Sequence, residues 1–307
     1  MTHAGQRTVF RPAAVLALTA LCLLTACSGG SRPSSGPADS GSPASSPSAA
    51  SGGAGVTSGP SWLVTRSALV QLVANPSVRQ RLASARVYEI LQPGQRLLAG
   101  ISARAVVTFS SAATLVEAVQ QGMVPSDAYG VLYDPENWSF TPASEQRDPV
   151  AAARQAAQAA HRRGLKLLVA PALNLTSVLA PGSGPAGRGP RWRQFLNLRL
   201  LAHLAQVADV VELQAQSLER DTGTYTSFVR AAAAQARAAR SGITVLAGLS
   251  SNPPGPPVTG QHLTDVIRAT RSMVDGYWLN IPGQGARCPN CSAPAPGVAQ
   301  QALQAAI

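Results

Sequence analysis

Short apolar runs alternate with longer amphipathic stretches through most of the chain. The short runs are typical of buried strands, and apolar residues at helical spacing are typical of helices. The predicted strands are 105–109, 130–134, 166–171, 209–214, 243–249 and 276–281. The predicted helices are 112–121, 149–163, 191–207, 222–240, 260–273 and 297–306. This alternation predicts an α/β fold whose sheet is parallel, with right-handed helical crossovers.

The clearest of these units surrounds the Ala-rich helix 149–163. Asp148 is placed as its N-cap, and Gly164 stands just beyond its end. The strand before it ends in the acidic pair Asp134 and Glu136. Because side chains on a strand alternate between faces, both point the same way at the carboxyl end of the strand. In α/β folds, sites are built at that end.

The segment before residue 105 is less regular. Two short helices are predicted at about 66–74 and 76–83. Residues 87–91 and 96–101, joined by Pro93-Gly94, predict a hairpin with a type II turn.

Two architectures fit the alternation: a (β/α) barrel of the TIM type and an open, doubly wound sheet. No Gly-rich phosphate loop follows the first regular strand, as the open sheet of nucleotide-binding proteins would require. Glu212, Gln214 and Gln216 recur at a spacing of two, and polar side chains facing inward suit the mouth of a barrel. We therefore predict a TIM-like barrel. Since only six strands are clear and 87–101 must supply the rest, an incomplete or irregular barrel stays open.

The first 27 residues have the pattern of a targeting segment. Arg7 and Arg11 precede an apolar run that ends in Leu-Thr-Ala-Cys at Cys27. This ending resembles the lipobox of bacterial lipoproteins, which implies cleavage before Cys27 and attachment of lipid to its thiol. An ordinary secretory signal is the alternative. A lipid at Cys27 would anchor the protein to the extracellular face of the cell membrane.

Residues 28–60 consist almost entirely of Ser, Gly, Pro and Ala, which predicts a disordered linker. A flexible chain of this length holds its ends about 30 Å apart on average. From residue 61 to 307 the composition is that of a single globular domain.

Charge and motifs exclude several classes of function. The net charge is +11, but the arginines are scattered, so nucleic-acid binding is not expected. HExxH, GxSxG and clustered His ligands do not occur, and we predict neither a metal site nor a cofactor. Cys288 and Cys291 form a lone CxxC in a late loop, which favours a local disulfide over zinc binding.

Three carboxylates are the candidate catalytic groups. Asp134 and Glu136 share one strand end, and Glu212 lies on another strand. Two carboxylates of suitable separation supply the acid, and the base or nucleophile, of glycoside cleavage. The working pair would combine Glu212 with one of the other two. In the alternative, Asp134 only stabilises the Pro135 turn and Glu136 pairs with an arginine.

The candidate ligand-positioning residues are amides and aromatics: Trp138, Gln214, Gln216, Trp278 and Asn280. Sugar rings pack on aromatic faces, and amides suit hydroxyl groups. The competing interpretations are a core tryptophan at Trp278 and a solvated edge strand at 212–216.

The motifs Tyr-Asp-Pro-Glu-Asn-Trp (133–138), Gly-Tyr-Trp-Leu-Asn-Ile-Pro (276–282) and Cys-Pro-Asn-Cys (288–291) resemble a group of uncharacterised actinobacterial secreted lipoproteins. More distantly, an acidic pair at a strand end resembles glycoside-hydrolase-like TIM-barrel proteins. The second resemblance implies sugar chemistry, although the Asp-Pro-Glu turn matches no glycosidase signature.

These observations lead to three hypotheses. The first is a membrane-anchored barrel that hydrolyses envelope or extracellular polysaccharide. The second is a non-catalytic carbohydrate-binding or scaffold lipoprotein with the same cleft. The third, a solute-binding lipoprotein of a transporter, requires two lobes joined by a hinge.

Overall fold

The computed structural model describes residues 59–182, 190–253, 255–285, 288 and 291–306. The predicted signal peptide with its lipidation site Cys27, and the predicted linker up to residue 58, lie outside the described residues. Among the residues described, no helix combines the length and the apolar character needed to cross a membrane.

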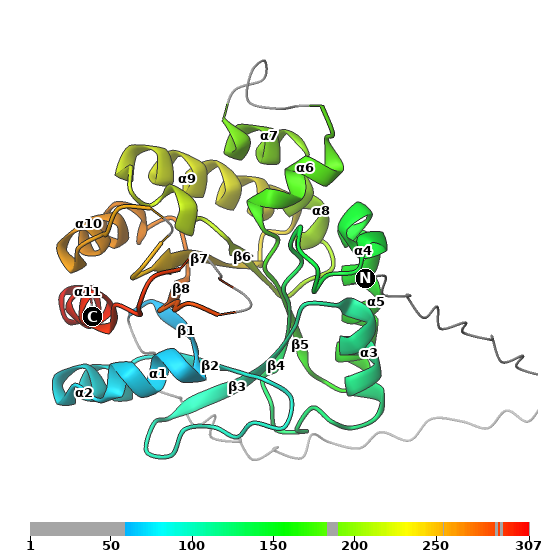
Figure 1. Ribbon diagram of the computed structural model, residues 1–307. Helices are drawn as coiled ribbons and strands as arrows, with labels where there is room; N and C mark the ends of the chain where they lie inside the picture. The colour runs from blue at the N-terminus through cyan, green and yellow to red at the C-terminus, as the bar shows by residue number, and fades with distance from the viewer. Residues whose placement is uncertain (1–58, 183–189, 254, 286–287, 289–290, 307) are drawn as a thin grey trace, which may run out of the picture. The chain divides into compact units, whose positions relative to one another are not determined.

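Eight parallel strands form a closed barrel in which each strand pairs with the next and the last pairs with the first (Figure 1). The strands are β1 (Ser61–Thr65), β2 (Val87–Leu91), β3 (Ala103–Phe109), β4 (Gly130–Tyr133), β5 (Lys166–Val169), β6 (Val210–Leu213), β7 (Thr244–Ser250) and β8 (Gly276–Asn280). The predicted TIM-type barrel is confirmed, and its sheet is complete. The two lobes that a transporter receptor requires are not found among the described residues.

Helices form a ring around the strands (Figure 1). They are α1 (Arg66–Val73), α2 (Pro76–Ser84), α3 (Ala112–Gln120), α4 (Ala143–Arg147), α5 (Pro149–Arg162), α6 (Thr176–Leu179), α7 (Arg191–Asn197), α8 (Leu200–Ala205), α9 (Thr222–Ala239), α10 (Gly260–Thr270) and α11 (Pro296–Ala306). The 3₁₀ helices are η1 (Leu173–Leu175) and η2 (Gln216–Leu218). The single helix predicted at 191–207 is divided into α7 and α8, because Arg199 between them adopts a left-handed conformation, with φ of 52°.

The hairpin predicted at 87–101 is wrong. β2 pairs in parallel with both β1 and β3, and 96–101 is not a strand. The type II turn itself is present, since the Gln95 N–H donates to the Gln92 carbonyl and Gly94 has φ of 80°. The loop after this turn is held to β2, where the Leu98 N–H donates to Glu89 at 2.9 Å. This loop therefore stands where other strand connections of the barrel have a helix.

β1 was missed because it is a single short apolar run directly after the predicted linker. Its Trp62 side chain is fully buried in the layer between strands and helices, and Leu63 is buried inside the barrel. Thr65 ends the strand and also caps α1, because its hydroxyl accepts a hydrogen bond from the Ala68 N–H. Five residues thus close the barrel and start the first helix.

The best-predicted element is α5. Asp148 accepts a hydrogen bond from the Ala151 N–H at 2.9 Å, and Pro149 occupies the first helical position. Gly164 follows the helix with φ of 70°, a conformation that favours glycine. A stripe of buried alanines faces inward and allows close packing on α3 and β5.

The barrel has two apolar layers. The outer layer lies between strands and helices and includes the fully buried side chains of Tyr133 and Tyr225. The inner layer, called here the inner plug, comprises Leu63, Ile90, Val106, Leu132, Leu168, Ala170, Val210, Leu246 and Trp278. Such a filled interior is typical of TIM barrels, whose sites lie beyond it at the carboxyl ends of the strands.

Candidate functional site

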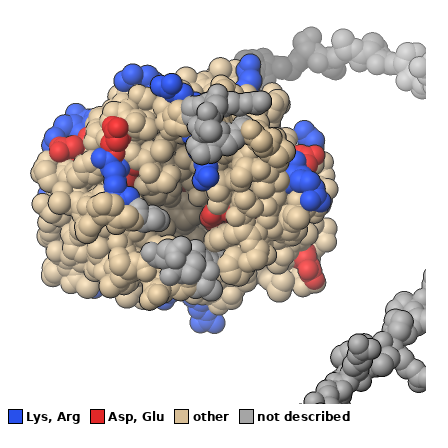
Figure 2. Space-filling model, turned by 45° about the horizontal axis from the view of Figure 1, so that its top comes forward, with Lys and Arg blue, Asp and Glu red and all other residues tan. Residues whose placement is uncertain are grey.

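The carboxyl ends of the strands surround a hollow in the molecular surface. Figure 2 turns the upper face of Figure 1 forward and shows this hollow, with acidic and basic side chains at its rim. Inward side chains of β4 and β6 change from apolar to polar at this end, from Leu132 to Asp134 and from Val210 to Glu212. We call this end the mouth of the barrel.

Glu212 is the deepest of the predicted site residues. Its exposed fraction is 0 %, and neither carboxyl oxygen has a hydrogen-bond partner among the described residues. Burial and the negative charges of Asp134 and Glu136 raise the pKa of Glu212 well above its ordinary value. This raised pKa favours the protonated form of Glu212, in which the carboxyl group can act as an acid.

Gly248 on β7 makes the space that Glu212 occupies. A methyl group at Gly248 would lie 2.6 Å from Glu212 Oε1 and 2.5 Å from the amide nitrogen of Gln216. Both side chains therefore lie against the glycine. Gln216 belongs to η2, so the prediction that it continues strand β6 is wrong. The strand ends at Leu213. The turn after it nevertheless brings the Gln216 amide over the same glycine.

Asp134 follows β4 and is buried, with an exposed fraction of 6 %. The Gln214 side chain donates from Nε2 to Asp134 Oδ1 at 2.7 Å and to the Ala170 carbonyl at 2.8 Å. The predicted residues Asp134 and Gln214 are thus in direct contact. This hydrogen bond connects the ends of β4 and β6 across β5.

Glu136 is partly exposed and lies in the loop after β4. Asn174 of η1 donates from Nδ2 to Glu136 Oε2 at 3.3 Å, and the Glu136 N–H donates to the Thr141 hydroxyl at 3.2 Å. Its charge contributes to the raised pKa of Glu212, so the three predicted carboxylates share one region.

Trp138 lies in the same loop, at the rim of the mouth. Its indole N–H donates to the Thr141 hydroxyl at 2.8 Å, and Gln146 donates to its carbonyl at 2.8 Å. The ring meets Phe140 edge to face, with ring centroids 5.1 Å apart. Phe140 is 44 % exposed, so the pair presents apolar surface to solvent. Phe140 was not predicted as a site residue, because a phenylalanine in a loop has no pattern to distinguish it.

The two candidates on β8 differ in their surroundings. Trp278 is buried in the inner plug, and its indole N–H has no hydrogen-bond partner among the described residues. Asn280 ends the strand and is only partly buried. Trp278 therefore packs in the core, as the alternative interpretation held. Asn280 lies at the height of the mouth.

A further buried carboxyl group, Glu219, was not predicted. Its exposed fraction is 0 %, and its Oε2 accepts a hydrogen bond from the Ser250 N–H at 2.8 Å. Burial raises the pKa of Glu219 well above its ordinary value, despite opposing effects of the Ser250 N–H and Arg220. Because β6 has ended, Glu219 supplies the hydrogen-bond acceptor for the last residue of β7. No periodic pattern surrounds it in the sequence.

The predicted disulfide between Cys288 and Cys291 is present. Among the described residues, no group of three or more His, Cys, Asp or Glu side chains could hold a metal ion. The side chains described above at the mouth carry carboxyl, amide and aromatic groups.

Solved structures with similar folds are TIM-barrel proteins of diverse activity. A sugar phosphate isomerase/epimerase from Parabacteroides distasonis has 9 % identity and a TM-score of 0.45, covering 82 % of this chain and 96 % of its own. A protein described as a candidate α-L-fucosidase from Bacteroides thetaiotaomicron has 9 % identity and a TM-score of 0.44. The match covers 68 % of this chain and 80 % of the other.

The glycoside hydrolase domain of PgaB (BpsB) from Bordetella bronchiseptica has 12 % identity and a TM-score of 0.41. The match covers 72 % of this chain and 93 % of the other. At this level the likeness concerns the fold and says nothing about the reaction. No family model and no curated protein sequence matches the chain.

Proposed function

We propose that the protein is a membrane-anchored, exported glycoside hydrolase that cleaves envelope or extracellular polysaccharide at the mouth of the barrel. One observation carries the proposal. A fully buried carboxyl group, Glu212, has a raised pKa and lies near two other carboxyl groups. Glycoside cleavage requires one protonated carboxyl group as the acid and one ionised carboxylate as its partner.

In this proposal Glu212 protonates the leaving oxygen, and Glu136 acts as the nucleophile or as the base that activates water. Glu136 suits the second role better than Asp134, because it is partly exposed, whereas Asp134 is buried and accepts a hydrogen bond from Gln214. Gln216 lies against the same glycine as Glu212, so its amide group is near the proposed acid.

Sugar binding would use the rim of the mouth. Trp138 and Phe140 offer apolar ring surface on which the CH face of a sugar can pack. Gln216 and Asn280 would bind hydroxyl groups. Trp278 acts indirectly, as part of the floor beneath the ligand.

The test is an assay of reducing ends released from a panel of cell-wall and extracellular glycans. Glu212→Gln and Glu136→Gln should each lower kcat at least about 100-fold with little change in KM, because general acid–base groups contribute about 10²–10⁴-fold. Glu117→Gln is the matched control, since Glu117 is exposed on α3 and its carboxylate accepts a hydrogen bond from Gln121. Activity should fall as pH rises through the raised pKa of Glu212, because the acid must be protonated.

A second candidate, a non-catalytic carbohydrate-binding or scaffold protein, is favoured by the complete burial of Glu212. In this case the wild-type protein binds a glycan without releasing reducing ends. Both carboxyl-to-amide variants then bind it as tightly as the wild type. Trp138→Ala weakens binding under both candidates and shows that the ligand lies at the mouth.

The cellular location is part of the proposal. The lipobox-like sequence ending in Cys27 supports a lipid anchor on the extracellular face of the cell membrane, and the linker would let the barrel reach glycan beyond it. Cys27→Ala should release the protein from the membrane fraction and abolish incorporation of labelled fatty acid. Membrane retention of the variant would contradict the anchor.

A further inference from the structure

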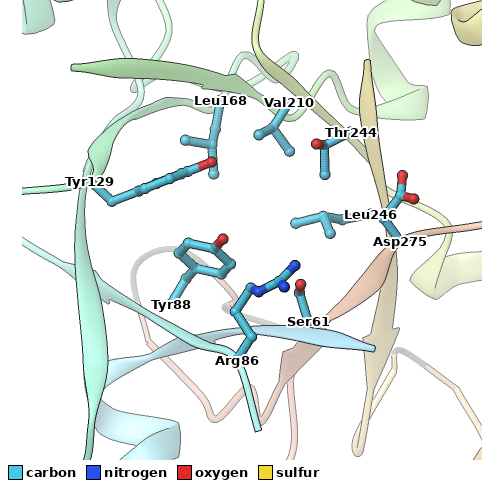
Figure 3. A pocket seen from close by; sticks show the side chains of 9 residues that line it. All are labelled: Ser61, Arg86, Tyr88, Tyr129, Leu168, Val210, Thr244, Leu246 and Asp275. Carbon is cyan, nitrogen blue, oxygen red and sulfur yellow. The ribbon is translucent and has the colours of Figure 1, made fainter. Parts of the chain in front are cut away.

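The opposite end of the barrel contains a cavity that the mouth does not explain. It has a volume of about 240 Å³ and is lined by Ser61, Arg86, Tyr88, Tyr129, Leu168, Val210, Thr244, Leu246 and Asp275 (Figure 3). Except for Leu168 and Leu246, these residues lie at the amino ends of their strands or just before them, and Leu168, Val210 and Leu246 belong to the inner plug. The plug therefore forms the floor of this cavity and separates it from Glu212.

Two tyrosines form one wall. The rings of Tyr88 and Tyr129 lie with their centroids 4.7 Å apart and tilted by 50°. Figure 3 shows both rings reaching into the cavity from β2 and from the residue before β4. Burial and the neighbouring Tyr88 raise the pKa of Tyr129 to about 12, so its hydroxyl stays protonated and can donate a hydrogen bond. Each tyrosine ring offers an apolar face with a polar hydroxyl group at its edge.

The charged residues of the lining differ in their partners. Asp275 accepts hydrogen bonds from Arg237 at 3.0 Å and from the Val245 N–H at 2.8 Å, and its carboxylate turns away from the cavity (Figure 3). The guanidinium of Arg86 points across the cavity beside Ser61 and has no hydrogen bond or ion pair within the described part of the chain. The charge offered to a ligand is therefore positive.

The remaining residues of the lining add hydroxyl groups and an apolar floor to the cavity. Ser61 and Thr244 present hydroxyl groups, while Leu168, Val210 and Leu246 form an apolar floor. Ligand sites typically combine an apolar lining with a few convergent polar groups, in volumes of about 300–1,000 Å³. A cavity slightly below that range suits a ligand with a single ring.

We propose that this cavity binds a small ring-shaped carboxylate, whose ring packs on Tyr88 and Tyr129 and whose carboxylate pairs with Arg86. Both a sugar acid and an aromatic acid have this shared chemistry. An arginine fork binds a carboxylate through two parallel hydrogen bonds, which fixes the orientation of the ring. The site is independent of the proposed hydrolysis at the mouth.

The experiment is isothermal titration calorimetry of the purified protein with glucuronate, benzoate, glucose and inorganic phosphate. At least one of the first two should bind saturably and at least tenfold more tightly than glucose or phosphate. Glucuronate alone would identify a sugar acid, and benzoate alone an aromatic acid. If neither binds, or if glucose or phosphate binds as tightly, the proposal is wrong.

Two variants locate the binding. Arg86→Gln should weaken it at least tenfold, whereas Arg154→Gln, which changes an exposed arginine on α5 outside the lining, should leave it unchanged. Thr244→Leu should weaken it by filling the cavity from a partly exposed position. Unaltered thermal melting shows that the variants are folded. Binding that survives Arg86→Gln and Thr244→Leu would lie elsewhere and would overturn the proposal.

Discussion

Asp209 directly precedes β6 at the amino end of the barrel, and Glu212 lies within the same strand toward the mouth. Burial favours the protonated form of both. The Asp209 carboxylate forms hydrogen bonds with the Leu167 N–H at 2.9 Å, with His161 at 2.7 Å and with Lys166 at 3.1 Å. These bonds outweigh the effect of burial, so the pKa of Asp209 is lowered. Glu212 has no such donors, and its pKa is raised.

In this pair, three donors to Asp209 outweigh the effect of burial on its pKa, whereas burial and two neighbouring negative charges act on Glu212 with no donor among the described residues to oppose them. At the amino end the donors make Asp209 a stabilising part of the barrel. At the mouth an unsatisfied carboxyl group costs stability, and such costs are typical of sites kept for function. The inner plug keeps the two environments apart.

A cavity in the inner plug should give the largest loss of stability. Leu168→Ala removes a buried side chain that lies between the two ends and should lower the free energy of unfolding by about 2–5 kcal/mol. Urea denaturation measures the change. Leu97→Ala is the control, because Leu97 is 38 % exposed, and it should change stability by less than about 0.5 kcal/mol. A loss below about 1 kcal/mol at Leu168 would mean that the plug is poorly packed.

The sequence predicted the regular part of this barrel well, because strong signals agree there. In α5, the N-cap Asp148, the alanine stripe and the terminal Gly164 all indicate the same helix, and the structure confirms it. Around β2 the sequence pattern did not determine the path of the chain. Pro93-Gly94 correctly predicted a turn, but a turn between apolar runs does not reveal whether the chain returns as a strand or passes outside the sheet.

The site was predicted in part for a similar reason. Alternation along a strand placed Asp134, Gln214 and Glu212 on the inner face, and these residues do lie together at the mouth. It could not show that Gln216 lies beyond the end of the strand. Glu219 was missed because it meets Ser250 through the tertiary fold, which no local pattern encodes.

The next prediction tests the mouth directly. Since the native protein binds the Glu212 proton more tightly than the unfolded chain, wild-type stability falls as pH rises from the unfolded pKa of about 4.3 to the raised folded pKa. Glu212→Gln removes this loss. The variant should be more stable than the wild type by about 1–3 kcal/mol at pH 8, with little difference at pH 4. Denaturation at both pH values measures this, and a less stable variant at pH 8 would contradict it.

A smaller effect is expected from crowding Glu212. Gly248→Ala places a methyl group 2.6 Å from Glu212 Oε1 and 2.5 Å from the Gln216 amide, but both are the ends of flexible side chains that can shift. The loss of stability should therefore be about 1 kcal/mol, at the low end for overpacking. Gly242→Ala is the control, since no atom lies within 4 Å of its added methyl group. Equal melting temperatures for the two variants would show that Gly248 is not needed to make room for Glu212.

The smallest effect should come from Asp209 and should have the opposite dependence on pH. Because the folded pKa is lowered, the stability that Asp209 contributes is present above the unfolded pKa of about 3.9 and is lost as pH falls through the folded pKa. Asp209→Asn should lose about 0.5–1 kcal/mol at pH 7, a small amount because the side chains of His161 and Lys166 are 45 % and 52 % exposed.

At pH 3 the loss from Asp209→Asn should shrink toward zero. Asp127→Asn, at an exposed position, is the control in the same denaturation series. As pH rises, the free energy of unfolding of Glu212→Gln should increase relative to the wild type. That of Asp209→Asn should decrease relative to the wild type. If both variants moved in the same direction with pH, donors would not distinguish the two ends, and the acid role of Glu212 would lose its physical basis.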